Sequence, residues 1–198
     1  MTLGSSLRHV AIITLFSCVA IASAKAQPVD SLGIPGPILF QGQEYALAWS
    51  SNPMPNYIKQ EYVPLDQSVE AYTDMIMIEV LAGDLTAGQV ATIQMQEIEA
   101  RKASDPVANH QMIRNEANGE FLLDFVISDL SADPIIVEWN AYRYSNLNNG
   151  QGVVLLAISR RGYGEESARE FLGQLGTMRS DAINALTNLE LPAIAMAR

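Results

Sequence analysis

Cysteine and histidine are scarce in this chain, and their scarcity excludes several kinds of site. The 198 residues include one cysteine, Cys18, and two histidines, His9 and His110. A lone cysteine forms no intramolecular disulfide, and it cannot supply a thiolate zinc site. No serine lies in a nucleophile-elbow motif that His110 could serve. We therefore expect no catalytic residue, no metal site and no cofactor, and we interpret His110 as an ordinary strand residue.

The first 26 residues have the three-part pattern of a cleavable secretion signal. Arg8 precedes an apolar run from Val10 to about Ala24, and Lys25 and Ala26 complete a cleavage site rich in small residues. The run is short against the about 20 residues that span a bilayer. We predict cleavage after Ala26, which would give a periplasmic or secreted protein with no membrane span.

A second interpretation of the same segment concerns Cys18. Residues 15–18 resemble the box of bacterial lipoproteins, in which the cysteine is lipidated and anchors the chain. Phe16 is bulky for that box, and apolar sequence continues beyond Cys18, so the cysteine is more simply a member of the apolar region. Cleavage after Ala26 would leave a mature chain free of cysteine.

Positive charge is also scarce. The chain has 12 lysines and arginines against 22 acidic residues, and its formal net charge is −10. Cleavage after Ala26 would remove Arg8 and Lys25 but no acidic residue, and the net charge would become −12. A protein this acidic is disfavoured as a binder of nucleic acid or of anionic lipid surfaces. We expect no nucleic-acid partner.

No repeat, charge block or low-complexity segment divides the remaining chain, so we predict one α+β domain over residues 44–192 and a short tail over 193–198. Proline and glycine are frequent in residues 27–43, which we interpret as an extended lead-in. Residues 44–49 and 57–63 have strand composition. Asp66 or Ser68 can then cap a helix that continues to Met75 or Ile76.

The apolar run over residues 75–81 fits either the end of that helix or a buried strand, and periodicity alone does not decide. Thr86 and Gln89 form a capping box that predicts a helix to about Lys102. The apolar residues that can form a stripe on this helix are Val90, Ile93 and Ile98.

The second half of the domain predicts a four-stranded antiparallel meander. Its expected strands are residues 108–117, 120–128, 136–144 and 152–160, the first two joined by a two-residue turn, Asn118-Gly119. Several strands are apolar on both faces, so we expect helices on each side of a sheet of about five to six strands. Ser167 and Glu170 form a capping box for a final helix that ends before Pro192.

Three segments resemble secreted bacterial proteins of unknown function: EYVPLDQSVEAYT at residues 61–73, EWNAYRY at 138–144 and SRRGY at 159–163. The order of elements also resembles the PsbP-like fold, which the photosystem accessory protein PsbP shares with the DcrB-like bacterial envelope proteins. This resemblance implies an antiparallel sheet between helices and a non-catalytic accessory or binding role. It supplies no site residue.

Aromatic and basic residues gather on the last two predicted strands, and they form the candidate binding site of the sequence. Arginines bind carboxylates and phosphates through charge-assisted hydrogen bonds. Alternatively, these arginines pair with Glu138, Asp124 or Glu165 and cover aromatic rings with their stems. The candidate binding residues are Trp139, Arg143, Arg160 and Arg161.

We therefore expect an exported accessory protein of the cell envelope that acts by contacting another protein. The first alternative is a carrier of a small or apolar ligand in a pocket between sheet and helix, with methionines lining it: Met75, Met77, Met95 and Met112. A third interpretation is a hydrolase that uses two carboxylates of the meander. Its candidate residues are Glu116, Glu120, Asp124 and Glu138.

Overall fold

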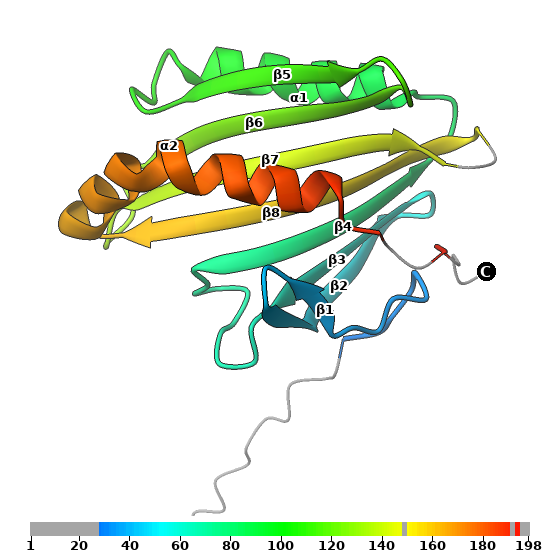
Figure 1. Cartoon of the computed structure of the whole chain (residues 1–198), viewed down its shortest axis with the longest axis horizontal. Helices are drawn as coiled ribbons and strands as arrows, with labels where there is room; N and C mark the ends of the chain where they lie inside the picture. The colour runs from blue at the N-terminus through cyan, green and yellow to red at the C-terminus, as the bar shows by residue number, and fades with distance from the viewer. Residues whose placement is uncertain (1–27, 148–149, 191–192, 195–198) are drawn as a thin grey trace, which may run out of the picture.

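An antiparallel sheet of eight strands carries one helix on each face (Figure 1). The computed structural model describes residues 28–147, 150–190 and 193–194, so the predicted signal, with Cys18 and Ala26, lies outside the described residues. Within the described ranges, no helix is long and apolar enough to cross a membrane. The elements are β1 (Ile38–Phe40), β2 (Gln43–Met54), β3 (Tyr57–Val63), β4 (Asp74–Ala82), α1 (Ala87–Arg101), β5 (Asn109–Asn115), β6 (Glu120–Asp129), β7 (Ile136–Asn146), β8 (Gly152–Tyr163) and α2 (Glu165–Thr187).

The sheet is larger than the five to six strands that we expected. Its strand order is β1-β2-β3-β4-β8-β7-β6-β5, and every neighbouring pair is antiparallel. One extra strand, β1, lies within the predicted lead-in and pairs with β2 through a turn at Gln41 and Gly42. Both residues have positive φ, which allows the tight reversal.

The other correction concerns residues 66–81. No helix begins at Asp66 or Ser68: residues 64–73 form turns, and the Gln67 side chain accepts hydrogen bonds from the Thr73 and Asp74 amides. The run that follows is strand β4, between β3 and β8. Because a central strand with both faces covered is apolar at successive positions, the run lacks the alternation that identifies a strand in sequence.

The helices confirm some of the capping predictions and correct others. α1 has the predicted capping box of Thr86 and Gln89. The predicted apolar stripe is wrong at Ile93, which is 49% exposed, because α1 approaches the sheet mainly through small residues. Its buried positions are Ala87, Ala91 and Ile98. α2 begins before the predicted Ser167 box, after Gly164, and no side chain caps it.

The four strands of the predicted meander all form, with β6, β7 and β8 joined in sequence order. The turn between β5 and β6 is longer than the two residues that we expected, because Asn115 pairs with Glu120 and leaves four residues between them. The side chains of Asn115 and Asn118 accept hydrogen bonds from turn amides and stabilise this longer reversal.

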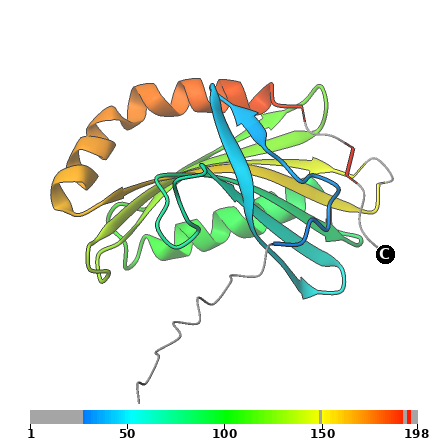
Figure 2. The ribbon, with the colours of Figure 1, turned by 90° about the horizontal axis from the view of Figure 1, so that it is seen from below.

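The two helices lie on opposite faces of the sheet (Figure 2), and both pack on the half that contains β7 and β8. α2 packs on β7 and β8. Residues of the lead-in continue the same hydrophobic core over β3. Buried Gln60 accepts hydrogen bonds from the amides of Ser31 and Leu32, and the Tyr62 hydroxyl donates to the carbonyl of Ile34. The lead-in is thus part of the folded domain.

On the other face, α1 packs on β5, β6, β7 and β8. Past the helix, much of the same face of β2 and β3 and the Glu79–Leu81 end of β4 carry half-buried or exposed side chains, whereas Met75 and Met77 of β4 are buried. We call this surface the open face; it consists of Trp49, Ser51, Tyr57, Lys59, Glu61, Glu79 and Leu81.

Candidate functional site

The four binding residues predicted from the sequence do not form one exposed cluster. Trp139, Arg143 and Arg160 lie on the face that α2 covers, whereas Arg161 lies on the α1 face, because successive strand residues point to opposite sides. Trp139 is 1% exposed, and its indole Nε1 donates to the Asp124 carboxylate at 2.6 Å. Its ring is therefore not available to stack on a ligand at the surface.

Each predicted arginine has partners inside the chain. The Arg143 guanidinium binds Glu120 at 2.7 Å and donates to the carbonyls of Leu186 and Leu189 at the end of α2. Arg160 pairs with Asp74 at 2.8 Å. Such pairs fix α2 and the strand ends, and an incoming anion would have to break them.

Arg161 is held on the α1 face by two contacts. Its Nε lies 2.6 Å from Glu138 Oε2, and its guanidinium lies 4.1 Å from the centroid of the Tyr72 ring. Burial by itself lowers the pKa of Arg161, but the neighbouring Glu138 carboxylate raises it overall. The charge of Arg161 is therefore neutralised within the fold.

The acidic residues of the meander are not arranged as a facing pair of catalytic acids. Glu120 and Asp124 lie on the α2 face, where they contact Arg143 and Arg179, whereas Glu138 lies on the α1 face. The Glu116 side chain is 83% exposed, in the turn after β5. Strand parity separates Glu138 from Glu120 and Asp124, and those two carboxylates each contact an arginine instead of facing one another across an open site.

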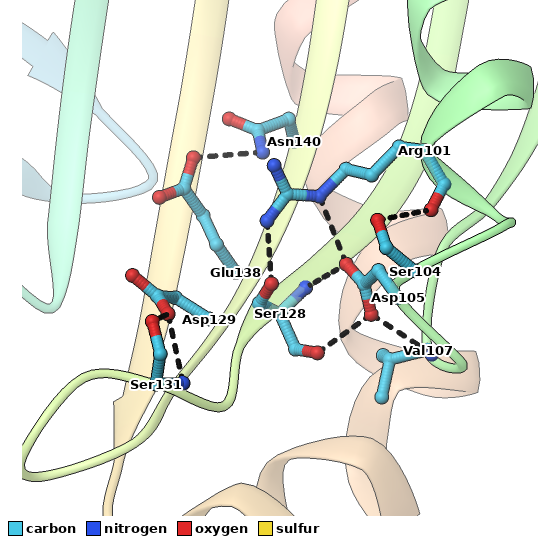
Figure 3. Close-up of polar contacts among 9 residues, drawn as sticks. All are labelled: Arg101, Ser104, Asp105, Val107, Ser128, Asp129, Ser131, Glu138 and Asn140. Carbon is cyan, nitrogen blue, oxygen red and sulfur yellow. Dashed lines mark hydrogen bonds and ion pairs between the residues drawn. The ribbon is translucent and has the colours of Figure 1, made fainter.

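A polar network fixes the end of α1 to the sheet (Figure 3). Asp105, which is 6% exposed, accepts hydrogen bonds from the Ser128 amide and hydroxyl, both at 2.6 Å, and from the Val107 amide at 3.0 Å. Arg101 Nε donates to the same carboxylate at 3.0 Å, and Arg101 Nη2 donates to the Ser128 carbonyl. Nearby, Asn140 donates to Glu138 at 2.9 Å. The network attaches the C-terminal end of α1 to β6.

A groove of about 380 Å³ lies between α1 and the strands beside it, where the helix leaves the open face uncovered. We call it the α1 groove. Its walls are apolar and aromatic, with few polar groups. The lining residues are Met54, Tyr57, Lys59, Glu79, Leu81, Val90, Gln94, Tyr142, Tyr144, Val153 and Leu155.

A row of charged side chains crosses the mouth of the groove. Lys59 of β3 stands directly opposite Glu79 of β4, and its Nζ lies 3.5 Å from Glu79 Oε1 and 3.0 Å from Glu61 Oε1. The Tyr57 hydroxyl donates to Glu79 Oε2. Burial first, and then its contacts with Glu79, raise the pKa of Tyr57, so the phenol stays protonated and acts as a donor.

The floor of the groove is aromatic. Tyr142 packs edge-on against Phe125 and Tyr144, with ring centroids 4.9 and 6.2 Å away. Tyr144 also lines the groove and is 2% exposed. Burial, and then the charges of Glu79 and Glu97, raise the pKa of Tyr144.

Comparison with known proteins identifies the family of the chain. A family model of an uncharacterised bacterial family matches residues 32–191. The chain belongs to this family. No curated protein and no solved structure matches it. The matched region covers every strand and helix described above.

The sequence of this family member did not predict the α1 groove. Tyr57, Lys59 and Glu61 share one face of a correctly predicted strand, and that alternation was the only signal available. Its acidic partner, Glu79, comes from β4, which the sequence left unassigned. The predicted methionine pocket does not coincide with the groove, since Met75 and Met77 are buried in the α1-side core. In the part of the chain that the structure describes, no three potential metal ligands cluster.

Proposed function

We propose that this protein is an exported accessory protein of the bacterial cell envelope, and that it acts by binding another protein rather than by catalysis. The binding surface in this proposal is the α1 groove together with the open face. The observation that carries it is the uneven cover of the sheet: α1 packs on β5 to β8 and leaves the open face uncovered on the same side.

The composition of this surface supports a protein partner. Trp49 and Met54 are 39% and 50% exposed beside the groove, and tyrosines line it. Aromatic residues and methionine are enriched at protein interfaces, where they supply most of the binding free energy. The arginines predicted from the sequence are a weaker candidate surface, because each already forms an ion pair with a neighbouring carboxylate.

Export is supported by the sequence of residues 1–26, with cleavage after Ala26 and a soluble periplasmic or secreted product; lipidation at Cys18 is the alternative. We infer further that the fold is PsbP-like. The observed antiparallel sheet between two helices agrees with that resemblance, which also favours a non-catalytic accessory role.

A second candidate function is the transport of a small ligand. The volume of the α1 groove, about 380 Å³, is within the range of small-molecule sites, and its mostly apolar walls with few polar groups are typical of them. Native mass spectrometry of protein purified from its own envelope distinguishes the two functions. A stoichiometric small ligand supports the carrier, and its absence favours the protein partner.

Photo-crosslinking in the native envelope fraction tests the main proposal. A photoreactive residue at position 49 on the open face, or at position 54 in the α1 groove, is expected to capture one defined protein. The same residue at position 39 or 130, where Leu39 and Leu130 are 63% and 52% exposed elsewhere, is the control. Equal capture from all four positions, or no capture from positions 49 and 54, would refute the proposed surface.

A further inference from the structure

The charges around the α1 groove are unbalanced, and this imbalance indicates the chemistry of the partner. The side chains of Glu61 and Glu79 are only 15% and 18% exposed, and both contact the single cation Lys59. Two carboxylates against one lysine give the mouth of the groove a negative potential, which partial burial strengthens by reducing screening by water.

The apolar lining of the groove indicates what kind of side chain carries the positive charge of the partner. Leu81, Val90, Val153 and Leu155 can cover the aliphatic stem of a long side chain, and the tyrosines of the lining can contact its cationic end. Tyr144 lines the groove, and its hydroxyl can accept a hydrogen bond from an ammonium or guanidinium group. Apolar walls with carboxylates at the mouth thus match a lysine or arginine side chain.

The same charges argue against two other occupants. A second copy of the chain would bring an equal set of carboxylates to the surface, and each chain carries a net charge of −10 before any cleavage. An anionic ligand would meet Glu61 and Glu79 at the mouth of the groove, where Lys59 is already neutralised. Like charges brought together at an interface oppose binding.

We propose that the partner binds through a basic segment whose lysine or arginine side chain enters the α1 groove and replaces Lys59 as the cation bound to Glu79 and Glu61. This inference rests on the proposed function, because it specifies the partner of the same surface. Lys59 would then be an internal competitor that occupies the carboxylates until the basic segment displaces it.

The test uses a synthetic peptide of alternating leucine and lysine with blocked ends, titrated into the purified protein by calorimetry. Trp49, opposite Glu61 in the β2–β3 ladder, gives a second signal through its fluorescence, while Trp139 is buried elsewhere. Glu79→Gln is expected to weaken binding about fivefold, because a partly buried ion pair is lost while an acceptor for Tyr57 remains. The matched control is Glu116→Gln, an equal charge change far from the groove.

The decisive variant is Lys59→Gln. It removes the internal competitor, so it is expected to strengthen peptide binding several-fold, whereas a merely structural role of the Lys59 pairs would leave binding unchanged or weaken it. Circular dichroism melting checks that each variant is folded, and Lys59→Gln keeps the test decisive if Glu79→Gln fails to fold. The control peptide has the same length and blocked ends but alternates leucine and glutamate. The inference is overturned if this control peptide binds as well, or if Glu79→Gln and Glu116→Gln change binding of the leucine–lysine peptide equally.

Two further results separate this inference from the proposed function. If positions 49 and 54 crosslink to a defined protein whose capture is insensitive to Glu79→Gln and Lys59→Gln, the basic segment is refuted and the binding surface stands. A concentration-dependent dimer, measured by light scattering and abolished by substitution of Leu81, would overturn both, because the surface would then join two copies of this chain.

Discussion

Substitution of Asp105 by asparagine is expected to destabilise the fold by about 3 kcal/mol, because hydrogen bonds to a charged group contribute about 1.5 to 3 kcal/mol each. One oxygen of Asp105 accepts from Ser128 N and Arg101 Nε, and the other accepts from Ser128 Oγ and Val107 N. Asparagine replaces one of these acceptors by an amide donor. Whichever way the amide is oriented, it places a donor against a backbone N–H and leaves that N–H without a partner in a buried site.

The loss is expected to depend on pH in a defined direction. Burial by itself raises the pKa of Asp105, but the hydrogen bonds from Ser128, Arg101 and Val107 together lower it below its usual value. A carboxylate with a lowered pKa in the folded state contributes stability that is complete above its unfolded pKa of about 3.9 and is lost as pH falls through its folded pKa. The difference in the free energy of unfolding between the wild type and Asp105→Asn should therefore become smaller as the pH falls.

Urea denaturation at pH 7 and at several acidic values, followed by circular dichroism, measures both effects. Asp129→Asn is the matched control, because Asp129 also accepts hydrogen bonds from a following serine but is exposed, and little change is expected. The reasoning is refuted if the two variants lose the same stability at pH 7, or if the gap for Asp105→Asn widens as the pH falls.

Three other substitutions test the packing around the site. Gln60→Leu leaves two amides of the lead-in without their acceptor, so it is expected to cost about 2 kcal/mol and to make residues 28–36 sensitive to protease. Arg143→Met frees the last carbonyls of α2, so a lower melting temperature is expected while peptide binding at the α1 groove stays unchanged. Gly88→Ala places a Cβ 2.8 Å from the Phe121 ring, whereas Gly173→Ala meets no atom within 4 Å. In chemical denaturation, the free energy of unfolding of Gly88→Ala is expected to be about 1 kcal/mol lower than that of Gly173→Ala.

Local patterns were sufficient for the parts of the fold that depend on neighbours in sequence. Alternation and turn residues predicted strands β2, β3 and β5 to β8, and the capping box at Thr86 predicted the start of α1. These features were predictable because a strand repeats every two residues and a cap needs only the next turn of the helix. The same reasoning overlooked β1, which is too short to show a period.

The candidate site was less predictable, because it depends on pairings between distant residues. The sequence suggested arginine binding residues, but only the sheet register showed that Arg143, Arg160 and Arg161 meet Glu120, Asp74 and Glu138. In the same way, Lys59 and Glu79 form a pair only because β3 and β4 are adjacent in the sheet. Ion pairs across strands leave no local mark in a sequence.

The sequence by itself determined an acidic chain poor in cysteine, an α+β class and most of the strands, since composition and short-range periodicity carry that information. The tertiary structure decided that residues 75–81 form the central strand β4, because burial on both faces of a sheet removes the alternation. It also decided where α1 lies, and thus which half of the sheet is left open. That placement results from the burial of Ala87, Ala91 and Ile98 against distant strands, which no local pattern specifies.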